Sequence, residues 1–92
     1  MEIKLEQSET RGAFYIEQEG KRVAFMEFSK AGNDRIIISH TQVDNVLRGK
    51  NAGKQLVAAA VEHARKNNIK IVPLCPFARS VFDKVKEYSD VL

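Results

Sequence analysis

The stretch that organises this chain is Val46-Leu47-Arg48-Gly49-Lys50-Asn51-Ala52-Gly53-Lys54, which joins a polar loop to an amphipathic segment. Its two glycines allow a positive φ and a close approach of the backbone to a ligand. The first N–H groups of a helix have no partner within the helix, and together with the helix dipole they favour an anion. These residues, called the glycine loop below, are therefore predicted to bind a phosphate. A basic, flexible helix entry without a ligand explains the same composition equally well.

A helix is predicted to follow directly, from Ala52 to Asn67. Apolar residues recur here at helical spacing, and the charged residues lie on the opposite face. The apolar positions are Leu56, Val57, Ala60, Val61 and Ala64.

Strands are expected on both sides of this helix. Upstream, residues 2–6, 13–18, 23–28 and 35–40 have the alternation or β-branched composition of strands, with turns at 9–12, 19–21 and 31–34. The unbroken run 35–40 is expected to be a central strand buried on both faces. Downstream, residues 69–74 form a short strand that Pro73 and Pro76 end, and residues 77–87 a second short helix.

The resulting order is β-β-β-β-α-β-α, an antiparallel β-meander extended by a βαβ unit, in the α+β class. The strands on either side of a crossover helix must run parallel. The helices are expected to form a second layer, or two further layers if they take opposite faces. Residues 1–92 are long enough for one modest core, so a single domain is predicted.

The composition excludes several classes of protein. A net charge of +3 and a pI near 9.2 give a mild basic bias, but the cations are few and no aromatic residues interleave with them, so nucleic-acid binding is not expected. The sequence has no membrane-spanning apolar run and no signal peptide pattern, and a cytoplasmic protein is expected. A single cysteine rules out an internal disulfide, and no carboxylate or cysteine spacing suggests a metal site.

Three candidate features are expected to meet at one edge of the sheet. The carboxyl ends of parallel strands lie at the same edge, where ligands bind in sheets of this kind. His40 ends the strand before the glycine loop, and Cys75 follows the strand after the helix. A histidine, the only thiol and the glycine loop should therefore converge.

Each of these side chains also has a structural explanation. Pro76 suits the first position of a helix, which would place Cys75 at its N-cap, where a thiolate is stabilised. A buried, unreactive cysteine is the alternative. His40 is a candidate base, or a strand-end residue that bonds a backbone carbonyl. His63 is expected on the surface of the helix.

The element order, residues 48–53 and the segment Ile71-Val72-Pro73-Leu74-Cys75-Pro76-Phe77 resemble the compact, single-domain members of the GNAT acetyltransferase superfamily. In that superfamily, a Gln/Arg-x-x-Gly-x-Gly/Ala motif lines the pyrophosphate of acetyl-CoA with backbone amides. Arg48 and Gly53 match its two ends. Asn51 stands where the middle glycine is usual, although asparagine tolerates a positive φ better than most residues.

The resemblance implies a truncated GNAT-like fold that binds acetyl-CoA as cosubstrate. The implied contacts to acetyl-CoA come from Val46, Arg48, Gly49, Lys50, Asn51, Ala52, Gly53 and Lys54. Only a short turn fits between the first two strands, where larger members carry helices, so the acceptor cleft should be shallow or open. A histidine and a cysteine recur in the compact group at the positions of His40 and Cys75, which are the candidate catalytic residues.

The predicted function is an acetyl-CoA-dependent N-acetyltransferase with an unknown amine or protein acceptor. In direct transfer, His40 or water deprotonates the amine, and N–H groups near residues 43–46 stabilise the oxyanion. In a two-step route, Cys75 first takes the acetyl group. A CoA-binding or protein-interaction module without catalysis is the alternative.

Overall fold

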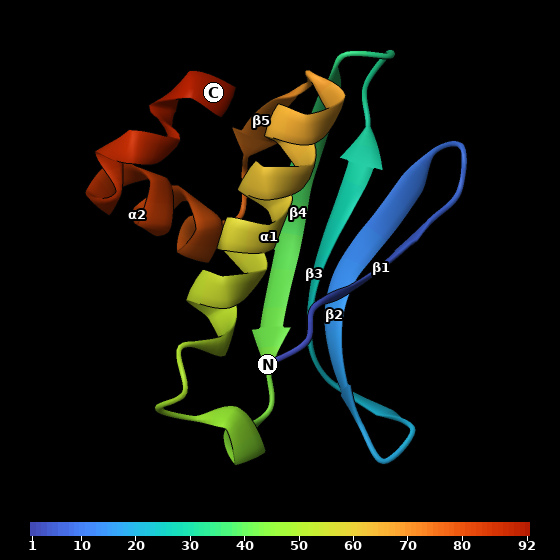
Figure 1. The fold of residues 1–92 in the computed structure, drawn as a ribbon, viewed down its shortest axis with the longest axis vertical. Coiled ribbons are helices and arrows are strands. Elements are labelled where there is room, and N and C mark those ends of the chain that lie inside the picture. The colour runs from blue at the N-terminus through green and yellow to red at the C-terminus, as the bar shows by residue number, and fades with distance from the viewer.

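The computed structural model describes residues 1–92, in which one five-stranded sheet packs against the helices (Figure 1). The strands follow one another in the sheet in chain order, β1-β2-β3-β4-β5. Their bounds are β1 Lys4–Gln7, β2 Arg11–Gln18, β3 Lys21–Lys30, β4 Arg35–Val43 and β5 Lys70–Pro73. The helices are α1 Ala52–Asn67 and α2 Pro76–Lys84, with the short 3₁₀ helices η1 Asn45–Leu47 and η2 Lys86–Val91.

The first four strands form the predicted antiparallel meander, and β5 pairs with β4 in parallel. The β2–β3 hairpin turns tightly because Glu19 and Gly20 both have a positive φ, of 52° and 77°. Helix α1 connects β4 to β5 and lies in front of the sheet, roughly along β4 (Figure 1). The α+β class and the βαβ unit predicted from the sequence are confirmed.

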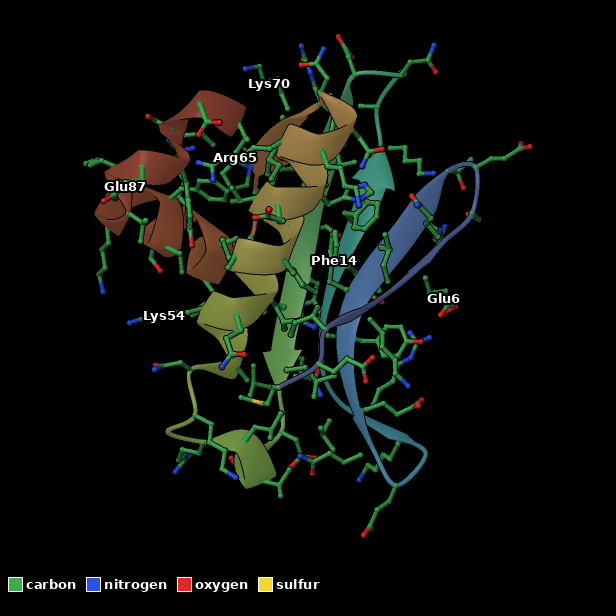
Figure 2. The ribbon with its side chains drawn as sticks, viewed as in Figure 1. Glu6, Phe14, Lys54, Arg65, Lys70 and Glu87 are labelled. Carbon is green, nitrogen blue, oxygen red and sulfur yellow. The ribbon has the colours of Figure 1, made fainter.

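The core lies between the sheet and the helices. All five apolar positions predicted for α1 are buried in it, together with Phe14 and Met26 from the sheet. Phe14 lies beside α1, on the side of β2 (Figure 2). Burial alternates along the strands, since Ile36 and Ile38 are buried whereas Ile37 is only partly buried. The helices therefore cover one face of the sheet, and the fold has two layers.

The expectation that residues 35–40 are buried on both faces is wrong. β4 does lie inside the sheet, between β3 and β5, but its second face has no covering helix. A continuous β-branched run gives no alternation from which the exposed face could be recognised.

A β-bulge interrupts the pairing of β3 with β4. Phe28 lies opposite Ile38 and Glu27 lies opposite His40, so Ser39 is an extra residue in β4. Beyond the bulge Met26 lies opposite Thr41. Residues opposite each other in an antiparallel pair share a face, so Thr41 lies on the face of buried Met26 and His40 on the uncovered face.

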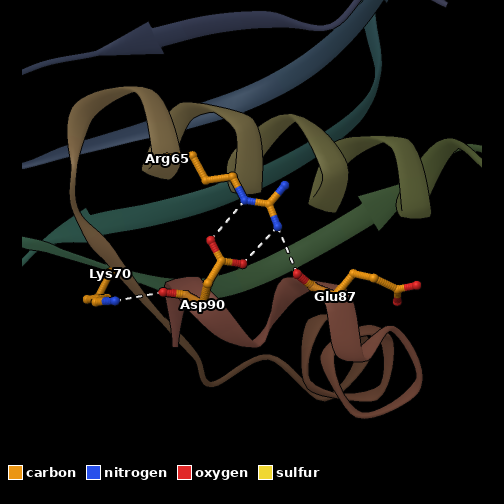
Figure 3. Close-up of polar contacts among 4 residues, drawn as sticks. All are labelled: Arg65, Lys70, Glu87 and Asp90. Atoms are coloured by element: carbon orange, nitrogen blue, oxygen red, sulfur yellow. Dashed lines mark hydrogen bonds and ion pairs between the residues drawn. The ribbon is translucent and has the colours of Figure 1, made fainter.

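The C-terminal segment is held against α1 by polar contacts (Figure 3). Arg65 forms two hydrogen bonds to the Asp90 carboxylate, of 3.0 and 2.8 Å, and one to the Glu87 carbonyl at 2.8 Å. Lys70 donates to the Asp90 carbonyl at 2.6 Å. Helix α2 ends earlier than predicted, at Lys84, and η2 continues to Val91. None of the helices is long and apolar enough to cross a membrane.

Candidate functional site

The glycine loop leads into α1 through two residues in the left-handed region. Gly49 has φ 80°, and Asn51 has φ 58° and ψ 29°. Asparagine thus adopts the conformation that glycine would provide at this position. The Asn51 side chain makes no capping hydrogen bond to the helix, so the first N–H groups of α1 are not satisfied by the usual cap.

The backbone N–H groups here form an unpaired set. Five donors have no hydrogen-bond partner in the protein, and they belong to Gly49, Asn51, Ala52, Gly53 and Lys54. The Lys50 N–H donates to the Leu47 carbonyl, and the first N–H of α1 with a helical partner is that of Gln55. Such a run of free donors at a helix N-terminus is a site for an anion.

Charge at the loop is positive. The first turn of α1 contains no acidic residue. Lys50 and Lys54 are exposed and form no ion pair, and Lys54 points to solvent (Figure 2). Arg48 donates to the Asn45 side-chain oxygen at 3.3 Å, and its charge has no carboxylate partner. These residues fit a diphosphate.

Gly53 has a second role in packing. A Cβ at this position would lie 2.6 Å from the Phe77 ring, which no real contact allows. The aromatic ring at the start of α2 therefore rests against the backbone of α1 next to the free N–H groups. This contact joins the glycine loop to the segment that carries Cys75.

Strands β4 and β5 separate at the same edge. Their pairing ends at Ile38 and Pro73, and the N–H groups of Leu74 and Cys75 both donate to the Ile38 carbonyl, at 3.0 and 3.1 Å. Beyond Ile38, β4 has no partner strand on this side. Four exposed apolar side chains belong to the segments that end at this opening, namely Val43, Val46, Leu74 and Phe77.

Cys75 lies at the opening as the N-cap of α2, with Pro76 in the first turn, as predicted. The residue is 5% exposed. Its thiol donates a hydrogen bond to the Thr41 hydroxyl, with the sulfur 3.3 Å from Oγ1. The thiol therefore lies just beneath the surface and has a polar partner.

The pKa of Cys75 is the result of opposing effects. Burial raises the pKa, whereas the Thr41 hydroxyl and the backbone N–H groups of Ala78, Phe77 and Thr41 lower it. The balance leaves the pKa of the thiol below its ordinary value. In the resting thiol, the Cys75 side chain makes no capping hydrogen bond to α2.

His40 is not paired with Cys75 as the strand ends suggested. The bulge at Ser39 turns it to the uncovered face, where its ring packs against Phe25 at a centroid distance of 5.8 Å. The side chain is exposed. Its role as a base stays a prediction, but such a base would act from the side of the sheet opposite Cys75.

Two other expectations need correction. The N–H groups of Asp44 and Val46 are already bonded, to the Val23 carbonyl and to the Asp44 carboxylate, so residues 43–46 offer fewer oxyanion donors than predicted. His63 is partly buried, with its ring edge 5.6 Å from Phe14, and its pKa is lowered by burial and by Lys30. It lines a cleft of about 510 Å³ at the far end of α1 from the glycine loop.

Sequence reasoning missed Thr41 and Phe77 as members of the site. Gly53 is a signal for Phe77, because the Phe77 ring packs where a larger side chain at position 53 would lie. The signal can be used only if the contact between α1 and α2 is known. Thr41 could not be found from alternation along β4, because nothing in the sequence marks Ser39 as an extra residue.

Known proteins resemble this chain over most of its length. Residues 13–91 match the family model of the GCN5-related N-acetyltransferases. The solution structure of a GCN5-like protein from Staphylococcus aureus is 39% identical, with a TM-score of 0.73, over 96% of this chain and 85% of that chain.

More distant structures share the fold. Ribosomal-protein-alanine N-acetyltransferase from Brucella melitensis biovar Abortus 2308 is 22% identical, with a TM-score of 0.68, over 85% of this chain and 64% of that one. A Bacillus anthracis structure that contains acetyl coenzyme A is also 22% identical, with a TM-score of 0.57, over 72% of this chain and 38% of that one. This chain thus spans less than two thirds of these two larger proteins. The match over residues 13–91 shows that the chain belongs to the GCN5-related N-acetyltransferase family.

Proposed function

We propose that this protein is an acetyl-CoA-dependent N-acetyltransferase that transfers an acetyl group to an amine acceptor. The observation that carries the proposal is the run of five unpaired N–H groups at the start of α1. In this proposal the diphosphate of acetyl-CoA accepts hydrogen bonds from them, and Arg48, Lys50 and Lys54 supply neutralising charge.

The opening between β4 and β5 is the proposed path of the pantetheine arm. The free edge of β4 beyond Ile38 can pair with the amide groups of an extended chain. Apolar side chains of Leu74 and Phe77 can cover the same chain. A ligand that starts at the glycine loop and runs along this edge brings its thioester to Cys75.

Two reactions fit this arrangement. In the two-step route the Cys75 thiolate attacks the thioester carbonyl, the new S–C bond forms, and coenzyme A leaves as a thiolate that takes up a proton. The acceptor amine then attacks the acetyl-cysteine, loses a proton to water, and releases the Cys75 thiolate. In direct transfer, the amine attacks the thioester itself after His40 or water has taken its proton, the C–S bond breaks, and coenzyme A leaves as a thiolate that takes up a proton.

Ligand binding is tested by thermal unfolding with acetyl-CoA. A ligand that binds only the folded protein stabilises it by about 2.7 kcal/mol at a hundredfold excess over its dissociation constant. Tripolyphosphate, which lacks adenine and pantetheine, should give a much smaller shift. Absence of any shift at millimolar acetyl-CoA would refute the proposal.

The two routes are separated by intact mass after a rapid quench. An adduct of one acetyl group that disappears in Cys75→Ser supports the two-step route. If the adduct persists in Cys75→Ser, the acetyl group is not on Cys75 and the two-step route loses its support. If no adduct forms while free coenzyme A accumulates with an amine, the result supports direct transfer. If acetyl-CoA binds but no amine or peptide causes release of free coenzyme A, the protein is a binding module without catalysis.

A further inference from the structure

Thr41 is the side chain of β4 that contacts the Cys75 sulfur. Its Oγ1 lies 3.3 Å from Sγ, and this is the only side-chain hydrogen bond that joins β4 to the segment after β5. The backbone on either side is fixed, because Met26 lies opposite Thr41 and Cys75 donates its N–H to Ile38. The contact thus links two rigid elements across the opening.

We propose that Thr41 is a positioning residue for Cys75, whose hydroxyl holds the sulfur at the N-terminus of α2 and donates a hydrogen bond to the thiolate. The inference concerns the thiol itself, and it rests on the proposed function only where Cys75 accepts the acetyl group.

The bulge determines that a threonine performs this role. Ile36 and Ile38 lie on the helix-covered face of β4, so an unbroken strand would place His40 on that face and Thr41 on the other. The extra residue Ser39 exchanges the two. A histidine beside the thiol would add a titrating, cationic partner, whereas the hydroxyl remains neutral at every pH at which the protein folds.

The hydroxyl can serve both states of the sulfur. In the resting state the thiol donates to Oγ1. When the thiol loses its proton, the hydroxyl hydrogen rotates and donates to the negative sulfur. The N–H groups of Phe77 and Ala78 at the start of α2 add to this stabilisation.

Charged groups on the surrounding elements do not replace Thr41. On α2, Arg79 is exposed and lies 3.9 Å from Asp83. On α1, Lys54 is exposed. Lys70 lies at the opposite end of β5 and bonds the Asp90 carbonyl, and His40 faces away on β4. The leading effects on the Cys75 pKa are burial and hydrogen bonds.

The test is the pH dependence of alkylation by iodoacetamide in the absence of acetyl-CoA. Cys75 is the only cysteine, so the rate reports one thiol. In Thr41→Val, which keeps the shape of the side chain without the hydroxyl, the midpoint of the rate profile should rise by about one pH unit, since one unit corresponds to the loss of a typical hydrogen bond. Thr41→Ser should restore the wild-type midpoint.

Gln42→Ala, a change at an exposed neighbour in β4, is the matched control and should leave the midpoint unchanged. Circular dichroism establishes that each variant is folded, and Thr41→Ala replaces the valine variant if that one does not fold. Equal midpoints for the wild type and a folded variant without the hydroxyl would overturn the proposal. Because acetyl-CoA is absent, failure of acetyl-CoA to bind the wild type refutes the proposed function without affecting this result.

Discussion

The two ends of α1 satisfy their backbone groups in opposite ways. Each end is next to an asparagine in the left-handed region, Asn51 with φ 58° and Asn68 with φ 56°. At the C-terminus, the N–H groups of Asn68 and Ile69 bond helix carbonyls, and Arg65 is fixed by Asp90. At the N-terminus, five N–H groups have no partner, and the first turn contains no acidic residue.

The difference separates stability from function within one helix. Capped ends with complementary charge stabilise a helix, so the C-terminal end contributes to folding. The N-terminal end has no side-chain cap, and its lysines lie at the positive end of the helix dipole. This placement of positive charge is unfavourable unless an anion is bound. Such an arrangement is expected where a ligand completes the site.

The largest effect is expected from valine at the two asparagines. A β-branched residue in the left-handed region costs about 1–2 kcal/mol, so Asn51→Val and Asn68→Val should lower the free energy of unfolding by similar amounts. Only Asn51→Val should also weaken acetyl-CoA binding, by about tenfold or 1.4 kcal/mol. Urea unfolding and isothermal titration measure the two quantities.

Glycine at either asparagine is the matched control, because it adopts this conformation without strain. Asn51→Gly should therefore keep both stability and affinity. Equal loss of affinity in Asn51→Val and Asn68→Val would mean that the two ends are not functionally distinct.

A smaller effect is expected at Gly53. In Gly53→Ala the new methyl group would force the Phe77 ring to move, whereas the gain in helix propensity, about 1 kcal/mol, offsets the cost in stability. The thiol of Cys75, two residues before Phe77, should then be alkylated several times faster at a fixed pH. In Gly49→Ala no atom lies within 4 Å of the new carbon, so only backbone strain at φ 80° is added. An unchanged alkylation rate in Gly53→Ala would show that Phe77 does not shield the thiol.

The smallest effect is expected at the C-terminal end. Arg65 lowers the pKa of Asp90 below its ordinary value of 3.8 through a hydrogen bond. A carboxylate with a depressed pKa contributes stability that is present above its unfolded value and is lost as the pH falls below it. Arg65→Gln should therefore lower the melting temperature slightly at pH 7, and the difference from the wild type should shrink below pH 3.8 and at high salt.

Arg79→Gln is the control for this change, because Arg79 and Asp83 form only an exposed pair at 3.9 Å. It should leave the melting temperature unchanged, and neither variant should alter acetyl-CoA binding. A difference between Arg65→Gln and the wild type that did not shrink at all as the pH fell from 7 to well below 3.8 would contradict a contribution from the Asp90 ion pair.

Elements that depend on local periodicity could be predicted from the sequence. The apolar spacing of α1, the turn at Gly20 and the first-turn proline of α2 each follow from neighbours along the chain. The positive φ at Asn51 was also foreseeable, because few other residues tolerate it.

Properties that depend on register and on layers could not be predicted. The uncovered side of β4 is hidden by its continuous isoleucine run, and the placement of His40 depends on one extra residue that makes no compositional signal. Convergence at the sheet edge was inferred correctly for the glycine loop and Cys75, which Phe77 connects through Gly53. The predicted partner of the thiol, His40, is one position away from the actual partner, Thr41. Neighbouring positions in a strand lie on opposite faces.

The Ile38 carbonyl, which accepts the N–H groups of both Leu74 and Cys75, has a consequence for motion. These two bonds share one oxygen at the point where β4 and β5 separate. Beyond this point, the hydrogen bond to Thr41 is the side-chain contact that joins the thiol to β4. Because one oxygen holds both N–H groups, a displacement of the Ile38 backbone would move Leu74 and the N-cap of α2 together. The thiol, which is 5% exposed at rest, is therefore reached only when the Thr41 contact breaks and the start of α2 moves, which makes its exposure a local opening of the fold.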